Sequence, residues 1–439
     1  MFTKIFYLKG GISMNLTRML VVLLILVCSA ILPIIAEAAT FTVNSTIDDI
    51  DADPGDGLCA TTGGLCTLRS AIQEANVLAG ADNIKLKAGL YMLTITGASE
   101  NVGATGDLDI TDDLTIIGKG AKSTFVNGGK LDRVFHIRGV ISVTMTDMTV
   151  QNGLAADDGL GDVNNAKGGG ILIESASTLT LKGITLSNNA ASGLVSSNGG
   201  GIHNWGTLTI TKSILSNSIV SNNAAWGGAV AGGGILNNIG TLKIRATTIF
   251  NNVAIGVNDG YGGGIINYGT LEIRQSTISN NTVSVQGNYG EGGGINNNGA
   301  LTIIQSTISN NTAQGVRGDG GGIANGGDLT ITTSIISGNI ARGPFGGGGG
   351  IATYWGNVVI TGSTLLNNAA SGVSGNPGRG GGIFLGDYTA VTVQGASKIL
   401  RNFASDAGGG ICYGGAGTGS ISPDSTVAKN IPDNIYPTQ

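Results

Sequence analysis

The sequence predicts an all-β chain that folds as a parallel β-helix. Nine copies of Gly-Gly-Gly-Ile recur at intervals of 28 to 33 residues, which is the periodicity of a stacked repeat rather than of one globular core. Each copy precedes two further runs in which apolar and polar residues alternate, and no helical pattern lies between them. We therefore expect coils of three strands each. About 12 such coils would stack at the usual strand spacing. The nine isoleucines are Ile171, Ile202, Ile235, Ile265, Ile295, Ile323, Ile351, Ile383 and Ile411.

The composition agrees with this fold and narrows the range of partners. Glycine accounts for 77 of the 439 residues and charged residues for only 12%, which suits a chain that turns sharply every few residues. The net charge is −5 and no basic run occurs, which argues against nucleic acid and anionic membranes as partners. Because a solenoid grows in one dimension, a chain of this length can form a single body, and we expect a monomer.

Residues 1–38 have the pattern of a secretory signal peptide. Three basic residues precede the apolar run Met19–Ile35, and Ala36-Glu37-Ala38 supplies the small residues that a signal peptidase requires. A membrane anchor is the competing interpretation, because the run is close to the ~20 residues needed to span a bilayer. We predict cleavage, no membrane span in the mature chain, and a secreted or cell-surface protein. Met14 is an alternative start, because the residues before it add little to the signal.

Residues 39–80 differ from the repeats and are expected to cap the first coil. Thr67–Leu78 has the pattern of a short amphipathic helix with Thr67 as its N-cap, and such a helix can cover the open edge and apolar core of a β-helix. In an exported protein we expect a disulfide between Cys59 and Cys66, which leaves Cys412 as a lone buried thiol.

The β-helix itself is expected to cover residues 81–430. Its early coils are irregular, and the regular array of repeats begins at about residue 168. The C-terminal tail, residues 431–439, contains two prolines and is expected to cap the far end loosely.

Two stretches of the chain resemble known bacterial families. The segment Cys66-Thr67-Leu68-Arg69-Ser70-Ala71, preceded by Cys59 and by Asp53-Pro54-Gly55-Asp56-Gly57, resembles the CSLREA domain of exported β-helix proteins, with Thr67 and Ser70 as departures from that motif. The repeats are similar to the Gly-Gly-Ala-Ile and Phe-x-x-Asn motifs of chlamydial polymorphic outer membrane proteins. These resemblances imply a right-handed, pectate-lyase-like β-helix and an export route. Neither resemblance implies a catalytic activity or catalytic residues for this chain.

Alignment of the repeats on their isoleucines predicts ladders of stacked side chains. Coils stack at the ~4.8 Å spacing of neighbouring strands, so that the amide of each asparagine can bond to the next. Asparagine also tolerates the left-handed backbone of a sharp corner, and we therefore interpret these positions as structural. The main ladder comprises Asn189, Asn223, Asn252, Asn281, Asn311, Asn339, Asn368, Asn402 and Asn430, and a second comprises Asn204, Asn237, Asn267, Asn297 and Asn325. An aliphatic row of Leu186, Val220, Ile249, Ile278, Ile308, Ile336 and Leu365 is expected to form the core.

One row of positions, immediately before the Gly triplets, contains a candidate catalytic group. The alignment places Glu291 and Asp319 on adjacent coils, roughly 5 Å apart, a separation found in retaining glycosidases. Arg379 lies two coils further along the same row and could neutralise a sugar acid. The alternative is that these are solvated charges at the ends of variable loops.

A second candidate is an acidic turn near the amino terminus. Asp49, Asp51, Asp53 and Asp56 put four carboxylates within eight residues, and calcium prefers several oxygens from one flexible loop. The turn lacks the glycine and glutamate positions of an EF-hand, and the alternative is a turn whose carboxylates cap neighbouring amides. We expect no cofactor, and structural Ca²⁺ at this turn is the one candidate that the sequence offers.

The sequence as a whole favours a non-catalytic protein that binds a polysaccharide or a cell surface, as in adhesion. His136 and His203 are too far apart to form a dyad, and no serine or cysteine has a histidine partner for nucleophilic catalysis. The alternative is a carbohydrate-active enzyme, a polysaccharide lyase or a glycoside hydrolase, that uses Glu291, Asp319 and Arg379. Convergence of several titratable groups in one cleft would distinguish an enzyme from a binding protein.

Overall fold

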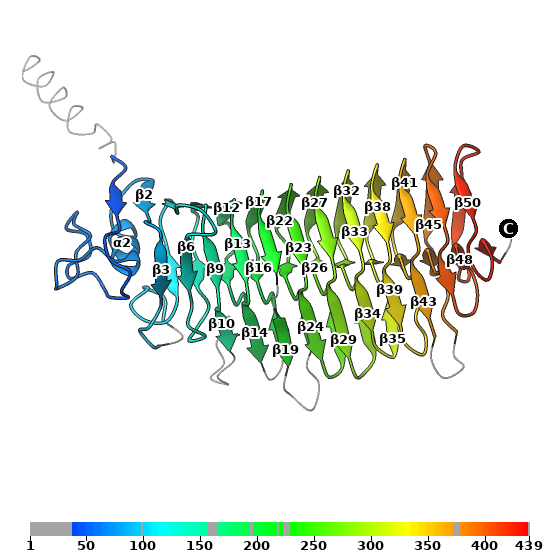
Figure 1. Cartoon of the computed structure of the whole chain (residues 1–439), viewed down its shortest axis with the longest axis horizontal. Helices are drawn as coiled ribbons and strands as arrows, with labels where there is room; N and C mark the ends of the chain where they lie inside the picture. Colours follow the sequence, from blue (N-terminus) through cyan, green and yellow to red (C-terminus); the bar gives the residue numbers. More distant parts are fainter. Residues whose placement is uncertain are drawn as a thin grey trace, which may run out of the picture. The chain divides into compact units, whose positions relative to one another are not determined.

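The chain folds as a nearly all-β parallel β-helix in its computed structural model, which confirms the predicted fold class (Figure 1). The structure describes residues 37–97, 100–156, 166–193, 196–216, 219–222, 229–372 and 377–437. Neighbouring coils pair through parallel strands, and the compact unit that they form spans Ala38–Gln439. The predicted signal peptide at 1–38 lies almost wholly outside the described residues.

Three long sheets form the main body of the β-helix. Each regular coil gives one strand to each of these sheets, as the sequence predicts, and the 12 strands in two of them agree with the expected number of coils. Sheet A has 13 strands, from β1 (Thr40–Thr42) to β49 (Thr418–Ile421), sheet B has 12, from β3 (Gly89–Met92) to β50 (Thr426–Ala428), and sheet C has 12, from β4 (Leu108–Ile110) to β51 (Ile435–Tyr436).

Two further sheets form a side lobe that the sequence pattern does not predict. The segments expected to be variable loops before the Gly triplets are two additional strands in the middle coils, and Figure 1 shows one of these sheets as a row of strands beside the main body. Sheet D has nine strands, from β10 (Leu154–Ala156) to β47 (Phe403–Ala404), and sheet E has five, from β15 (Ser196–Asn198) to β35 (Arg317–Asp319). One coil runs through β26 (Ile265–Asn267) of sheet C, β27 (Thr270–Arg274) of sheet A, β28 (Thr277–Ser279) of sheet B, β29 (Thr282–Val285) of sheet D and β30 (Tyr289–Glu291) of sheet E.

The main body and the side lobe each have an apolar core. In the main body alternate side chains of every strand point inward, so that Ile265, Leu271, Ile273 and Ile278 of one coil are at most 1% exposed. The core between sheets D and E is smaller and consists of alanine and valine. Its members are Ala155, Ala191, Val230, Ala254, Val283 and Val285.

The predicted aliphatic row is confirmed with one correction. Ile249, Ile278 and Ile308 occupy matching positions in sheet B, and the row continues in later coils. In the coil before Ile249 the row contains Leu215 rather than Val220, which belongs to sheet D. Two similar apolar–polar alternations follow one another in that repeat, and the sequence alignment used the second instead of the first.

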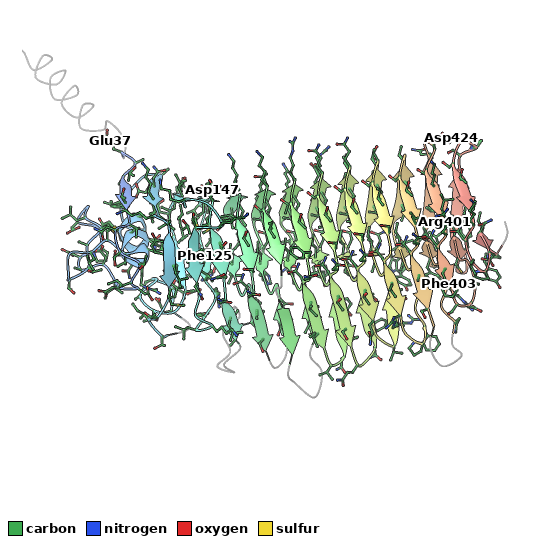
Figure 2. The ribbon with its side chains drawn as sticks, viewed as in Figure 1. Glu37, Phe125, Asp147, Arg401, Phe403 and Asp424 are labelled. Carbon is green, nitrogen blue, oxygen red and sulfur yellow. A yellow bond between two sulfur atoms is a disulfide. The ribbon has the colours of Figure 1, made fainter. Side chains whose placement is uncertain are left out.

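The chain passes twice through a narrow neck between the main body and the side lobe. It leaves the main body after sheet B and returns along the Gly triplet that precedes sheet C. A Cβ atom on Gly263 would lie 2.6 Å from the backbone carbon of Thr282, and Gly262 adopts a φ of +63°, so that the returning segment has no room for side chains. Figure 2 labels Arg401 and Phe403, which lie on the two sides of another neck.

Asparagine ladders stabilise the necks and corners, as predicted. The side-chain Nδ2 of Asn281 donates to Oδ1 of Asn311 at 3.0 Å, and the backbone N–H of Asn281 donates to the same oxygen at 2.9 Å. This pattern continues without a break from Asn252 to Asn430. The second ladder, from Asn204 to Asn325, has Nδ2–Oδ1 distances of 2.6 to 2.8 Å.

Two details of the ladder differ from the expectation. Asn189 donates to the carbonyl of Val150 rather than to an asparagine, and Asn223 lies outside the described residues. The left-handed backbone belongs to the residue before each ladder asparagine, such as Asn280 with a φ of 54°, and not to the ladder asparagine itself. The residue before the ladder asparagine thus makes the corner, and the ladder asparagine makes the hydrogen bonds.

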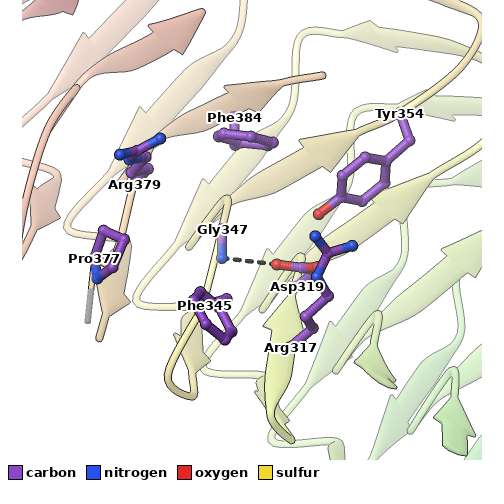
Figure 3. A pocket seen from close by; sticks show the side chains of 9 residues that line it. Arg317, Asp319, Phe345, Gly347, Tyr354, Pro377, Arg379 and Phe384 are labelled. Carbon is purple, nitrogen blue, oxygen red and sulfur yellow. Dashed lines mark hydrogen bonds between the residues drawn. The ribbon is translucent and has the colours of Figure 1, made fainter. Parts of the chain in front are cut away.

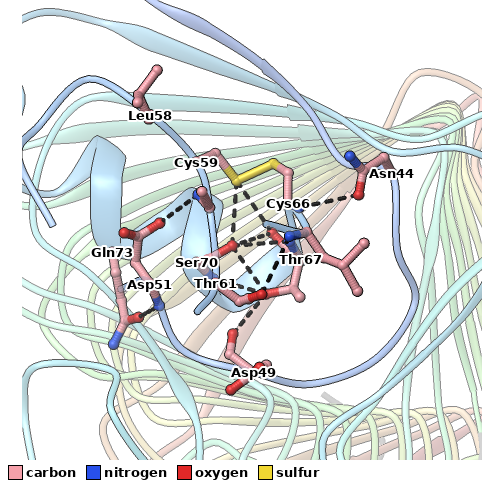
Figure 4. The surroundings of a disulfide bond; sticks show 12 residues. Asn44, Asp49, Asp51, Leu58, Cys59, Thr61, Cys66, Thr67, Ser70 and Gln73 are labelled. Atoms are coloured by element: carbon pink, nitrogen blue, oxygen red, sulfur yellow. Dashed lines mark hydrogen bonds between the residues drawn. A yellow bond between two sulfur atoms is a disulfide. The ribbon is translucent and has the colours of Figure 1, made fainter. Parts of the chain in front are cut away.

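The N-terminal cap contains the predicted helix, α2 (Leu68–Ala75), which ends three residues earlier than expected. The hydroxyl of Thr67 accepts a hydrogen bond from the N–H of Ser70 at 3.0 Å, so that Thr67 is the N-cap. Cys59 and Cys66 form a disulfide beside this cap (Figure 4), and Cys412 is a free, buried thiol.

The C-terminal tail is more ordered than the sequence suggests. Its strand β51 pairs with β48 (Ile411–Tyr413) and adds a last strand to sheet C, so that the tail extends the β-helix instead of covering it loosely. No helix within the described part of the chain has the length and the apolar character needed to cross a membrane.

Candidate functional site

The row of positions before the Gly triplets is in the register that the sequence alignment predicts. Tyr261, Glu291 and Asp319 are matched residues on successive strands of sheet E. The row then continues through Gly347 to Arg379. Periodicity alone therefore places the two carboxylates next to each other, because each coil repeats the position of the last.

Asp319 lies at the base of a pocket of about 170 Å³ on the side of the β-helix (Figure 3). Only 2% of Asp319 is exposed, and its Oδ1 accepts a hydrogen bond from the N–H of Gly347 at 2.8 Å. The hydroxyl of Tyr354 points toward the same carboxyl group and hydrogen bonds to it. The pocket is lined by Arg317, Asp319, Phe345, Gly346, Gly347, Tyr354, Pro377, Arg379 and Phe384.

Both carboxyl groups of the row have raised pKa values. Burial raises the pKa of Glu291 to about 7, and the nearby charge of Asp319 contributes to the rise, while a hydrogen bond from Asn296 opposes it. Burial also raises the pKa of Asp319 to about 6, against the hydrogen bonds from Tyr354 and Gly347 and the charge of Arg317. These two acids can therefore exchange protons with solvent near neutral pH.

Two arginines line the pocket and make it positively charged. Arg317 precedes Asp319 on β35, and its guanidinium lies 5.8 Å from the ring centre of Tyr289. Arg379 lies two coils away, half exposed, with Nε 2.9 Å from Oδ2 of Asp406. Because both guanidinium groups line one small pocket, an anionic ligand could contact both.

Aromatic side chains extend the site beyond the pocket. Inside it the rings of Tyr354 and Phe384 lie 6.0 Å apart. Trp355 follows Tyr354 in the chain. The rings of Trp355 and Tyr388 stack 6.3 Å apart, and these residues are 62% and 78% exposed. Two large exposed aromatic rings on adjacent coils form a flat apolar surface, which we call the aromatic pair.

Of the three residues predicted for this site, Asp319 and Arg379 line the pocket, whereas Glu291 lies beside Asp319 in the row and is not among the lining residues. Sequence reasoning identified these three residues from their shared row, but not Arg317 or Tyr354. A signal for Tyr354 exists, because it occupies the third position after the motif isoleucine. Two other aromatic residues, Trp205 and Tyr268, occupy the equivalent position in earlier coils.

The acidic turn is occupied by hydrogen bonds within the chain. The two oxygens of Asp51 accept from backbone N–H groups at 3.0 Å each. Asp49 and Asp56 each accept from a backbone N–H one or two residues away. These contacts agree with the capping alternative, and a Ca²⁺ site formed by these residues with Asp53 stays a prediction.

The two histidines lie closer together than their sequence positions suggest. His136 and His203 occupy the same row of sheet C and are separated by one intervening strand, β11 (Ile171–Ile173). His203 contacts Trp205, and burial lowers its pKa to about 3. The two rings therefore form no dyad, and His203 stays neutral at physiological pH.

Comparison with known proteins identifies no family for this chain. No protein-family model matches the sequence, and no curated protein matches it. Among solved structures, the A-module of the mannuronan C-5 epimerase AlgE6 from Azotobacter vinelandii matches with a TM-score of 0.36 and 15% identity, over 85% of this chain and 95% of that one. Similarity at this level does not indicate what the present protein does.

Proposed function

We propose that this protein is a secreted or surface-exposed β-helix that binds an acidic polysaccharide. The observation that carries the proposal is the pocket that Arg317 and Asp319 line at one end and Arg379 at the other, together with the rings of Tyr354 and Phe384. Its occupant would be a sugar acid, with neighbouring sugars of the same polymer on the aromatic pair.

The chemistry of the pocket suits a uronate. A guanidinium group donates two parallel hydrogen bonds to a carboxylate, which a lysine cannot do. The C–H faces of a sugar ring pack on aromatic rings, while its hydroxyls can bond to the Asp319 and Tyr354 oxygens. A pocket of about 170 Å³ has room for roughly one sugar ring, and its open side allows a chain to continue.

Export is part of the same proposal. It rests on the predicted signal peptide at 1–38 and on the resemblance of the cap to the CSLREA domain. The disulfide between Cys59 and Cys66 is compatible with an oxidising compartment outside the cytoplasm.

A carbohydrate-active enzyme is the second candidate, and one observation favours it. The pKa values of about 7 for Glu291 and about 6 for Asp319 are in the range that a general acid or base needs near neutral pH. A lyase or a glycoside hydrolase would use one of these groups to move a proton. A protein that only binds the polymer does not need raised pKa values at these two acids. Turnover must therefore be measured together with affinity.

The test is a binding titration of residues 39–439 with polygalacturonate and alginate, and with neutral dextran as the reference polymer. We expect acidic polymers to bind and dextran not to bind, with affinity that falls as salt rises. Arg317→Ala and Arg379→Ala should each weaken binding at least tenfold, because each removes a charge-assisted hydrogen bond. Lys243→Ala, which removes an exposed cation from sheet A, is the matched control.

Product formation is followed in the same samples. New reducing ends or unsaturated products that disappear in Glu291→Gln or Asp319→Asn would establish the enzyme instead of the binding protein. Equal affinity for dextran and for the acidic polymers, or equal losses in Lys243→Ala and Arg379→Ala, would refute the proposed pocket.

A further inference from the structure

The first coils contain a buried group of charged side chains that the proposed polysaccharide site does not use. Asp109 lies in β4, and its partner on the next coil is His136 in β7 (Phe135–Ile137). Both side chains point away from the apolar core of the main body, and Asp107 lies just before β4. Among the described residues, these three are the one group of at least three metal-binding side chains with a ligand atom each within 4.8 Å of the others.

Two carboxylate oxygens in this group lack a hydrogen bond although they are buried. Asp109 is fully buried, and its Oδ2 accepts from the N–H of Gly103 at 2.9 Å, while its Oδ1 has no hydrogen-bond partner. Asp107 is 4% exposed, and its Oδ2 has no hydrogen-bond partner either. The nitrogen atoms that contact them are His136 Nδ1, 3.1 Å from Asp109 Oδ1, and Arg133 Nε, 3.4 Å from Asp107 Oδ2. A buried carboxylate oxygen without a hydrogen bond destabilises the folded chain. A cation bound between these oxygens would remove that destabilisation.

The imidazole of His136 is held in the orientation of a metal ligand. Its Nε2 lies 3.1 Å from Oε1 of Glu174, at the far side of the ring from Asp109. Metal-binding histidines commonly donate their second N–H to a carboxylate, which fixes the tautomer and leaves the other nitrogen free to coordinate. With Nε2–H directed at Glu174, Nδ1 can offer its lone pair to the space shared with Asp109.

The local charges also favour a cation. Asp107, Asp109 and Asp132 are all at most 8% exposed, and the guanidinium of Arg133 contacts Asp107 and Asp132. A divalent metal ion bound to a neutral His136 would add two positive charges to this group. Excess negative charge buried at this site would then be compensated.

We propose that Asp107, Asp109 and His136 bind one divalent transition-metal ion, with Glu174 as the positioning residue for the imidazole. Metal–nitrogen and metal–oxygen bonds of about 2.0–2.2 Å place adjacent ligand atoms about 3 Å apart, which matches the 3.1 Å between Asp109 Oδ1 and His136 Nδ1. A mixed set of one imidazole and two carboxylates suits Zn²⁺ or Mn²⁺ better than Ca²⁺, which prefers oxygen ligands alone.

The role of the ion would be structural. Arg69 of α2 donates to the carbonyls of Gly103 and Asp107 at 3.0 and 3.1 Å, so that the N-terminal cap holds the loop that ends at Asp107 and leads into β4. His136 belongs to the next coil. The ion would therefore join the first two strands of sheet C, next to the point where the cap is attached.

The test uses residues 39–439 without an affinity tag, refolded without metal and with ZnCl₂ or MnCl₂, because the ligands are buried in the folded chain. We expect one Zn²⁺ per chain by elemental analysis after dialysis, a higher melting temperature with Zn²⁺, and no such rise with Ca²⁺. A chain refolded with Co²⁺ should show visible d–d absorption bands.

Three variants separate a metal site from a merely structural cluster. His136→Gln and Asp109→Asn should lose bound Zn²⁺, and Glu174→Gln should weaken Zn²⁺ affinity 10- to 100-fold, as outer-shell partners do. Glu174 is one-third exposed, so that its variant should fold even if a buried variant does not. Asp56→Asn in the acidic turn is the control and should retain full Zn²⁺ content. Zn²⁺ and Mn²⁺ contents well below one per chain, or full Zn²⁺ content in Glu174→Gln and His136→Gln alike, would overturn the proposal.

Discussion

The neighbours of an individual side chain in this protein are set largely by the repeat, because equivalent residues of successive coils lie side by side. Glu291 and Asp319 were predicted as neighbours because two coils of equal pattern place equal positions one strand spacing apart. Arg317 and Tyr354 could not be predicted in the same way, since whether they face the pocket depends on how sheet E folds back toward sheet C. The row of positions before the Gly triplets thus follows from the repeat pattern alone. The pocket also depends on how segments of different coils fold toward one another.

The raised pKa values of these acids lead to a prediction about stability. Protons bind more tightly to Glu291 and Asp319 in the folded chain than in the unfolded chain, where their pKa values are near 4.5 and 3.8. The free energy of unfolding should therefore fall as pH rises from about 4 to about 7, by on the order of 6 kcal/mol from this pair. Thermal melts across this pH range should show a flatter dependence for the double variant Glu291→Gln/Asp319→Asn.

Asp406→Asn is the control for this measurement. It removes an exposed carboxylate beside Arg379 and should leave the pH dependence as it is. A double variant with the same slope as the wild-type chain would show that the two acids are not perturbed by burial.

The hydroxyl of Tyr354 supports a second residue-level prediction. Tyr354→Phe removes a hydrogen bond that favours the charged form of Asp319, so that the pKa of Asp319 should rise above its value of about 6. The loss of stability should be about 1 kcal/mol, as for one buried hydrogen bond. Carboxyl carbon shifts followed by NMR titration would measure the pKa, and an unchanged value would show that the hydroxyl does not bond to Asp319.

At the scale of elements, the strands of the main body were predictable and the side lobe was not. Sheets A, B and C follow from three alternating segments per repeat, each with one buried face. The strands of sheets D and E are short and rich in small residues, such as Ala190–Gly193 in one coil, so that they have the composition of loops. The serine ladder between sheets A and B was also missed, although Ser276 N–H donates to Ser306 Oγ at 3.1 Å and the pattern recurs along the body.

The neck gives a prediction that belongs to the element. Gly263→Ala should cost about 3 kcal/mol of stability, because its Cβ would lie 2.6 Å from backbone atoms of Thr282 that cannot move independently. Gly63→Ala in the cap is the matched control, since its Cβ would meet nothing closer than 3.6 Å. Denaturation curves of both variants would measure this loss of stability. Equal midpoints for the two variants would mean that the neck is wider than described.

At the scale of the whole molecule, the β-helix resembles a one-dimensional stack. Each coil contacts the coils before and after it, so that stability is nearly a sum over coils and their interfaces. The number of coils was predictable because it follows from chain length and repeat length. The attachment of the tail as a last strand of sheet C was not, because two prolines in the tail argue against regular pairing.

Ile278→Asp tests this picture of the stack. An unpaired carboxylate in the core of the main body costs several kcal/mol, and the damage should be confined to the coils around β28. Hydrogen exchange should show lost protection there and retained protection in coils at both ends. Uniform loss of protection along the chain would indicate a single cooperative unit instead, and an unchanged melt would refute the register of sheet B.

The neck also determines where this protein can change in evolution. Insertions or deletions between a ladder asparagine and the next motif isoleucine alter the side lobe without shifting the register of the main body. The repeats already show such variation, with 14 residues between Asn368 and Ile383 but 8 between Asn402 and Ile411. Because the pocket lies where the lobe meets the body, new ligand preferences could arise by changes of lobe length while the inherited framework stays the same.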